Sequence, residues 1–128
     1  MTVTIPEWFD WALKQQPEHL DILLDETPTH YRAWGSPQDP LIVLVHGGAA
    51  HSGWWDHIGP HLAEHHRVVA PDLYGHGDSG YQNEYSLESW ATQVMAVAQA
   101  ETATKPIIVG HSMGGFVALT AAREHGQD

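Results

Sequence analysis

The chain has 128 residues, a length that suits one domain, and 42% of them are hydrophobic, which is enough to form a core. Its net charge of -11 argues against nucleic acid or an anionic membrane as a partner, because both bind through Lys and Arg, and no apolar run approaches the length of a membrane span. The chain has no cysteine, which excludes disulfides and thiolate metal sites, and its acidic start lacks the features of a signal peptide, so we expect a cytoplasmic protein.

The first part of the chain predicts a helix followed by two strands. Residues 5–15 form the helix, with Thr4 as its cap and Pro6 in its first turn. We expect this helix to pack on the body of the domain, and the alternative is that its aromatic side chains line a substrate entrance: Trp8, Phe9 and Trp11. Residues 19–25 and 29–34 predict two strands, joined at Glu26-Thr27-Pro28.

The rest of the chain alternates between strand and helix. Residues 41–45 are continuously apolar, as expected of a strand that is buried on both faces of a parallel sheet. The segments that follow are a partly helical stretch that Pro60 interrupts or restarts (54–65), a short strand (67–70), a glycine-rich loop (74–80), an amphipathic helix (86–102), a buried strand (106–109) and a final helix (113–124). This order predicts an α/β fold with a parallel, doubly wound sheet and helices on both faces.

One pentapeptide carries the chemistry, the run Gly110-His111-Ser112-Met113-Gly114. It lies between the apolar strand and the final helix, which is the context of a nucleophile elbow. Such a turn strains the serine backbone and presents its hydroxyl, and side chains at either glycine would collide with neighbouring chain. A glycine-rich turn with an incidental serine fits this context poorly.

Three further stretches make the chain resemble the α/β-hydrolase superfamily, from about residue 29 to residue 124. His46-Gly47-Gly48 follows the first apolar strand, and either Trp54 or Trp55 matches the aromatic residue that comes after that loop. Residues 71–79 read Pro-Asp-Leu-Tyr-Gly-His-Gly-Asp-Ser, with Tyr74 where the family more often has arginine. All of these stretches occur in the family's order.

The resemblance implies a role for each matching residue. Ser112 would be the nucleophile, and the backbone N–H groups of Met113 and Gly48 would form the oxyanion hole. His46 would shape its loop and His111 would flank the nucleophile, neither acting as the catalytic base. Asp72 and residues 75–79 would be structural.

The resemblance also implies an acid and a histidine after the serine, because a serine hydroxyl needs a base to become a good nucleophile. Only Glu124, His125 and Asp128 follow at a distance in sequence, and His125 would lie roughly 18 Å from Ser112 along one helix. We therefore expect residues 1–128 to be the N-terminal part of a single α/β-hydrolase domain, without its C-terminal strands and cap. The strand at 106–109 would then have an open edge through which two copies could associate.

Two other patterns have weaker claims. Gly75-x-Gly77-x-x-Gly80 matches a dinucleotide fingerprint, but no helix opens after it and Asp78 would repel a pyrophosphate. Three histidines, His57, His61 and His65, are spaced for one helix face, but Pro60 disturbs the register, so we expect a solvated face instead of a zinc or nickel site. We therefore expect no cofactor and no metal, and we expect Trp55 and Trp90 to pack in the core.

The residues and the resemblance together favour a hydrolase that cleaves an ester-like bond of a small-molecule substrate through a serine acyl-enzyme. A serine at the elbow argues against dehalogenases and epoxide hydrolases, whose nucleophile is an aspartate. The alternative is a non-catalytic binding or scaffold protein, or an inactive remnant, since the triad acid and histidine are not in evidence after Ser112.

Overall fold

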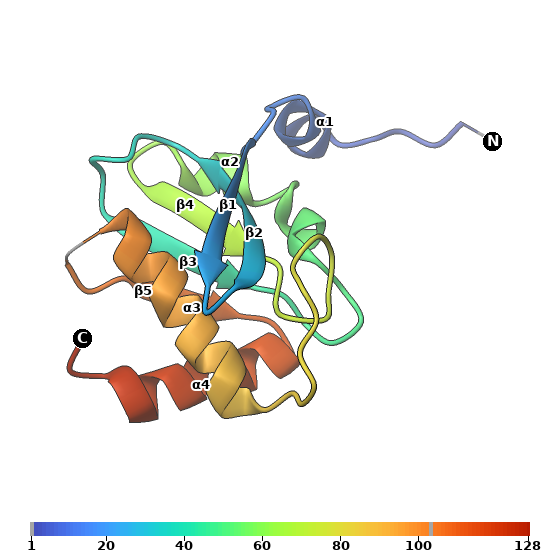
Figure 1. Cartoon of the computed structure of the whole chain (residues 1–128). Helices are drawn as coiled ribbons and strands as arrows, with labels where there is room; N and C mark the ends of the chain where they lie inside the picture. Colours follow the sequence, from blue (N-terminus) through green and yellow to red (C-terminus); the bar gives the residue numbers. More distant parts are fainter. Residues whose placement is uncertain (1, 103) are drawn as a thin grey trace.

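The computed structural model describes residues 2–102 and 104–128 and builds them around a five-stranded mixed sheet (Figure 1). The strand order is β1-β2-β4-β3-β5. In chain order the elements are α1 (Glu7–Leu13), β1 (Glu18–Leu24), β2 (Thr27–Trp34), β3 (Leu41–Val45), the 3-10 helix η1 (Ser52–Trp55), α2 (Gly59–Leu62), β4 (Arg67–Pro71), α3 (Leu87–Glu101), β5 (Ile107–Gly110) and α4 (Met113–His125).

The predicted α/β class is confirmed, and the parallel part of the sheet consists of β4, β3 and β5. The remaining strands, β1 and β2, form an antiparallel hairpin that joins the sheet antiparallel to β4. Asp25 and Glu26 both have positive φ, at 46° and 69°, which gives the tight reversal of a two-residue hairpin. The turn therefore lies one residue earlier than predicted, and β2 begins at Thr27.

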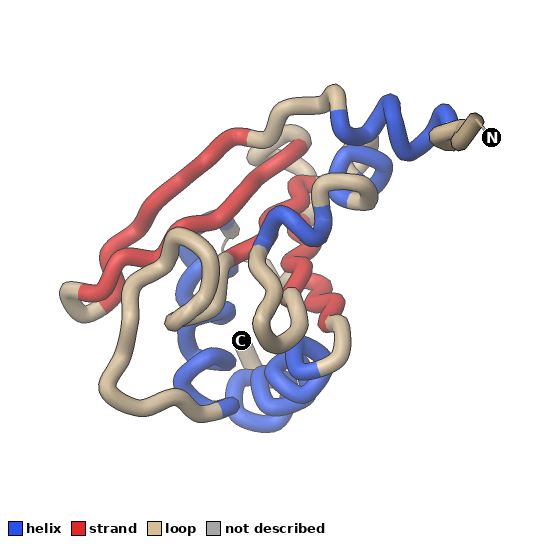
Figure 2. The backbone as a smooth tube through the Cα atoms, turned by 90° about the vertical axis from the view of Figure 1, so that its right-hand side faces the viewer, coloured by secondary structure: helices blue, strands red, loops and turns tan. Residues whose placement is uncertain are grey.

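Helices cover both faces of the sheet, and the alternation of β3 decides which residue meets which helix (Figure 2). Leu41, Val43 and Val45 point into a core shared with α3 and α4. Ile42 and Leu44 point the other way, into a second core to which Trp55 and the segment through α2 contribute. Because both faces are buried, an uninterrupted apolar run was the right signal for this strand.

Helix boundaries follow the predictions except at α1. Ser86 caps α3 through a reciprocal pair of hydrogen bonds with Ser89, and Pro60 restarts the helical stretch after η1, so that α2 is only a single turn. In contrast, α1 is shorter than residues 5–15, and the prediction that Thr4 caps it is wrong. Pro6 occupies the N-cap instead, and its carbonyl accepts the N–H groups of Phe9 and Asp10.

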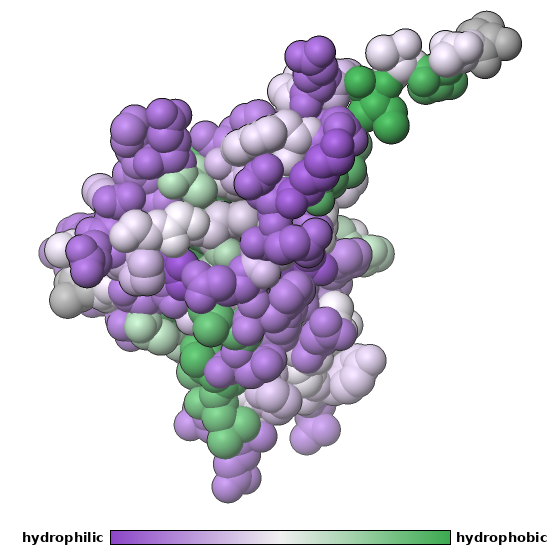
Figure 3. Space-filling view, turned by 90° about the horizontal axis from the view of Figure 1, so that it is seen from above, coloured by the Kyte–Doolittle hydropathy of each residue, from purple (hydrophilic) through white to green (hydrophobic). Residues whose placement is uncertain are grey.

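The outer edge of β5 has no partner strand among the described residues. Apolar side chains are exposed along this edge and on the adjacent face of α4: Ile107, Val109, Phe116 and Leu119. Pairing of two copies along this edge stays a prediction. The view in Figure 3 shows a mostly hydrophilic face, with apolar residues gathered at the N-terminal segment and in one short strip. Within the described residues, no helix has the length and apolar character needed to cross a membrane.

The glycines on either side of Ser112, Gly110 and Gly114, are in close contact with neighbouring main chain. A Cβ on Gly114 would collide with the main-chain carbonyls of Val45 and His46, and one on Gly110 would collide with the carbonyl of Gly114. Main-chain atoms on both sides cannot rotate away as a flexible side chain can. By contrast, a Cβ on the neighbouring Gly115 would meet nothing nearer than the Gly110 carbonyl oxygen at 3.6 Å.

Gly114→Ala and Gly115→Ala should therefore change stability in opposite directions. We expect Gly114→Ala to lower the free energy of unfolding by about 3 kcal/mol, because it overpacks a backbone contact. Gly115→Ala should raise it by about 0.5–1 kcal/mol, because alanine favours a helix more than glycine does. Urea denaturation followed by circular dichroism measures both; equal effects would contradict this account of the contact.

Candidate active site

Ser112 occupies the tight turn between β5 and α4, at the carboxyl end of the parallel strands. Its backbone has φ 55° and ψ -118°, a combination that is strained for a residue with a Cβ. The His111 N–H donates to the Val45 carbonyl at 3.0 Å, which continues the ladder between β5 and β3, and the Gly115 N–H donates to the Ser112 carbonyl at 2.8 Å. The side chain of Ser112 is consequently exposed at the first turn of α4.

The His46-Gly47-Gly48 loop lies directly beside this turn. A Cβ placed on Gly47 would be 3.4 Å from the Ser112 Cβ, and one on Gly48 would be 3.5 Å from the Met113 Sδ. The two predicted oxyanion donors, the N–H groups of Gly48 and Met113, thus belong to adjoining segments next to the Ser112 side chain. The N–H of Met113 is at the first position of α4, where a helix has no internal acceptor to offer.

His46 is fully buried and holds this loop in place. Its Nδ1–H donates to the Gly47 carbonyl at 2.7 Å, and its Nε2 accepts the Leu73 N–H at 3.0 Å. Burial lowers the pKa of the ring below its usual value, more strongly than the Gly47 carbonyl and Asp72 raise it. Both nitrogens are engaged and the ring is neutral, which supports a role in shaping the loop and leaves no free nitrogen for a catalytic base.

Asp72 fastens the next part of the same loop. Its carboxylate accepts the N–H of Ser52 at 2.7 Å, the N–H of Asp78 at 3.0 Å and the Nδ1–H of His30 at 2.8 Å. Burial alone would raise the pKa of this carboxyl, but the two N–H donors and the His30 ring outweigh burial and hold the pKa below its usual range. The carboxylate therefore joins η1, the glycine-rich turn and β2.

The glycines within residues 75–80 form this turn and are not part of a nucleotide-binding fingerprint. Gly75 and Gly77 have positive φ, and a Cβ on Gly77 would collide with the Asp72 carboxylate. No helix opens at Gly80, since α3 begins only at Leu87. The turn thus wraps around Asp72, as expected for a structural role.

The three spaced histidines do not share a helix face. His57 lies in the turn between η1 and α2, His61 donates to the Trp8 carbonyl at 2.8 Å, and His65 is exposed next to Glu64. Within residues 2–102 and 104–128, the group whose ligand atoms come close enough for a metal ion is His30, Asp72 and Asp78. Because N–H donors already occupy both Asp72 oxygens, this group is better explained as a hydrogen-bond network. The sequence analysis did not identify His30, because no neighbouring residue indicates that Asp72 is its partner.

No hydrogen bond of the described residues involves the Ser112 hydroxyl. The titratable groups after Ser112 lie at the far end of α4, where His125 contacts Asp128 at 3.4 Å. The predicted separation between Ser112 and His125 is therefore what the structure shows. Among the aromatic candidates, Trp55 is buried in the second core and Trp90 packs partly buried against the first, while Trp54 stacks on His111.

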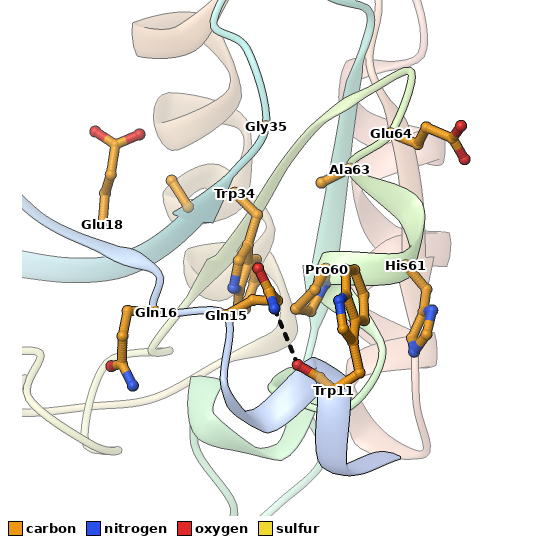
Figure 4. Close-up of a pocket in the computed structure, with 11 residues that line it drawn as sticks. Trp11, Gln15, Gln16, Glu18, Trp34, Gly35, Pro60, His61, Ala63 and Glu64 are labelled. Atoms are coloured by element: carbon orange, nitrogen blue, oxygen red, sulfur yellow. Dashed lines mark hydrogen bonds between the residues drawn. The ribbon is translucent and has the colours of Figure 1, made fainter. Parts of the chain in front are cut away.

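A cavity of about 530 Å³ lies away from this turn, between α1, the end of β2 and α2 (Figure 4). Trp11, Trp34, Pro60 and His61 form much of its wall. Trp34 is paired with Val68, near the start of β4, so the cavity is at the amino end of the parallel strands. Ser112 is at the opposite end, and the cavity is not part of the elbow.

The pKa of His46 makes stability depend on pH in a specific way. Its folded pKa lies below the unfolded value of about 6.5, so between the two values the unfolded chain binds more protons and stability falls as the pH drops. We expect the wild-type advantage over His46→Gln in unfolding free energy to shrink below about pH 6.5, by at most about 1.4 kcal/mol per pH unit. Denaturant titrations from pH 7.5 to 5 measure it; His65→Gln, at a ring without buried hydrogen bonds, is the control, and a constant advantage for His46 would refute the assignment.

Comparison with known proteins agrees with this geometry. Residues 40–128 match the family described as alpha/beta hydrolase fold. Over 89 residues, 69% of this chain and 33% of the relative, the chain is 39% identical to the pimeloyl-acyl-carrier-protein methyl ester esterase of Methylococcus capsulatus. It superimposes with a TM-score of 0.82 and 30% identity on the thioesterase domain from the curacin biosynthetic pathway, covering 88% of this chain and 41% of that one.

A third similarity has a different reaction in its name. Epoxide hydrolase A from Mycobacterium thermoresistibile is 27% identical with a TM-score of 0.78, covering 84% of this chain and 35% of that one. The chain thus spans about a third to two fifths of the length of these three proteins. The matched residues include both the His46 loop and the elbow, and by these features the chain belongs to the alpha/beta hydrolase fold family.

Proposed function

We propose that Ser112 is the nucleophile of a hydrolase that cleaves an ester-like bond of a small-molecule substrate through an acyl-enzyme. The observation that carries this proposal is the exposed serine with φ 55° on the turn into α4, beside the His46-Gly47-Gly48 loop. A strained serine backbone stabilises nothing by itself, and such strain is typical of functional sites.

The reaction would begin with attack of the Ser112 oxygen on the substrate carbonyl carbon, while the serine proton passes to a general base. The carbonyl oxygen becomes an oxyanion that accepts hydrogen bonds from the N–H groups of Gly48 and Met113, and the N-terminal end of α4 favours that negative charge. Collapse breaks the ester-like bond, the leaving group takes the proton, and the acyl group stays on Ser112. Water then attacks this acyl group by the same route and restores the hydroxyl.

The proposal for the whole protein includes a base that takes the serine proton. In this family it follows the nucleophile in sequence, after an acid. His46 and His30 do not qualify, because both of their ring nitrogens are already hydrogen-bonded in buried positions. The N–H groups of Gly48 and Met113 would position the reacting carbonyl. The acid and the histidine that complete the triad would come from outside the described residues.

The nucleophile and the relatives favour esters and thioesters over epoxides. A serine forms an ordinary acyl ester that water can cleave, and two of the similar proteins are named as an esterase and a thioesterase. The second candidate function is a non-catalytic binding or scaffold protein. The observation that favours it is the Ser112 hydroxyl, to which no described residue offers a hydrogen bond.

A fluorophosphonate probe separates the two candidates, because it modifies activated serines. Because the oxyanion donors act without the base, we expect slow labelling of the 128-residue chain at Ser112, as located by peptide mass spectrometry, and we expect it to vanish in Ser112→Ala. Ser36→Ala, at an exposed serine in a loop, is the matched control and should label like the wild type. Absence of labelling in a chain with native circular dichroism would favour the non-catalytic candidate for this length of chain.

A further inference from the structure

A line of six rings runs from α1 to the nucleophile turn; we call it the aromatic track. Neighbouring ring centres along it are 4.9 to 6.4 Å apart. In spatial order its members are Trp11, His61, Trp8, His57, Trp54 and His111. They come from three separate stretches of the chain, 8–11, 54–61 and 111, so the line exists only in the folded protein.

The indoles of the track are unusually exposed for tryptophan. Trp8 is 52% exposed, Trp11 48% and Trp54 49%, whereas Trp55, the residue next to Trp54, is only 6% exposed in the core. Side chains of this size normally bury most of their surface, and a contiguous row of exposed aromatic rings marks a binding surface. Packing of α1 on the domain body buries one side of the Trp8 and Trp11 rings. It does not explain why their other sides are apolar surface exposed to solvent.

One end of the track adjoins the proposed nucleophile. Trp54 stacks on His111 with ring centres 5.4 Å apart and planes 26° apart, and His111 immediately precedes Ser112. A Cβ on Gly47 would lie 3.4 Å from both the His111 Nδ1 and the Ser112 Cβ, so this ring borders the same space as the oxyanion donors. A group held against Trp54 would therefore have its reacting carbonyl near Ser112.

The charges around the track disfavour an anionic occupant. Carboxylates stand along α1 at Glu7 and Asp10, and Glu64 is exposed beside His61 and Ala63 near the far end. The ammonium of Lys14 is paired with Asp10 at 2.9 Å. No arginine lies on these elements, and the Arg32 guanidinium beside Gly53 is already paired with Asp56 at 2.9 Å, so an anionic group would find little to pair with. A narrow row of single rings is also much smaller than the roughly 800 Å² per partner of a standard protein interface.

We propose that the aromatic track binds the linear, uncharged acyl chain of the substrate, with the scissile carbonyl at the Ser112 end. This inference rests on the proposed function for the direction of the substrate, and it names the acyl chain as the part that is recognised. The helix α1 then has the role that the sequence left as the alternative, that of lining the approach to the site.

Binding of neutral esters to Ser112→Ala tests the track without chemistry at the serine. The probes are methyl butanoate, methyl hexanoate and methyl octanoate, and the readout is the indole N–H signals in two-dimensional nuclear magnetic resonance spectra, assigned by single Trp→Phe variants. We expect the Trp54 signal to shift with an affinity that rises with chain length, and the Trp11 signal, five ring-to-ring steps from His111, to stay in place because these chains do not reach it. The signals of Trp34, Trp55 and Trp90, which pack in the cores, should stay in place.

Two variants make this test decisive. Trp54→Ala should weaken binding of methyl octanoate by about tenfold, the effect of losing one aromatic contact of about 1.4 kcal/mol. Tyr81→Ala removes an aromatic ring that is even more exposed but lies outside the track, and should leave the affinity unchanged. Shifts confined to Trp34 would place the ester in the cavity of Figure 4 and overturn the proposal, as would an affinity independent of chain length. Ester binding without fluorophosphonate labelling would overturn the proposed function but would still support the aromatic track as a binding surface.

Discussion

The contact between Gly114 and the carbonyls of Val45 and His46 is the constraint on which the rest of this site depends. Because α4 has no side chain at this point, its first turn can sit against the end of β3. The chain must then reverse sharply between β5 and α4, and Ser112 takes a backbone conformation that other residues avoid. Exposure of the hydroxyl is a consequence of backbone packing, and no neighbouring side chain is needed to produce it.

Buried polar groups keep the facing loop at this position. His46 bonds the loop carbonyl on one side and the Leu73 N–H on the other, while Asp72 collects N–H donors from η1 and the glycine-rich turn. Each group is buried with its partners satisfied, and a satisfied network holds one arrangement where a half-satisfied one would be costly. Two elements far apart in sequence are thus fixed relative to Ser112 before any substrate arrives.

The proposed site separates the groups that would bind a substrate carbonyl from the group that would activate Ser112. The proposed backbone donors and the proposed nucleophile lie in the loop after β3 and in the turn between β5 and α4. Activation of the hydroxyl needs a base with a free ring nitrogen, and the buried histidines use theirs for structure. In the proposed aromatic track, exposed rings from α1 and η1 would add a surface for a substrate without supplying any acid–base chemistry.

The amino-acid sequence alone determined the features whose physics is local. An apolar run marked β3, an amphipathic repeat marked α3, and glycines on both sides of Ser112 marked a turn too tight for side chains. Local patterns also sufficed to reject the nucleotide fingerprint, since no helix followed it. Even so, the reversal at Asp25 and Glu26 and the N-cap of α1 were misplaced by a residue or two, because several neighbouring residues could satisfy the same turn or cap.

Only the tertiary structure decided which distant side chains meet. Nothing near His30 in the sequence indicates that Asp72 is its partner, and nothing in the spacing of His57 and His61 indicates that they face α1 instead of a metal. The same holds for the two adjacent tryptophans, of which Trp55 is in the core and Trp54 beside the nucleophile turn. The physical reason is that side-chain partners across the fold depend on how sheet and helices pack, and the period of a single segment carries no record of that packing.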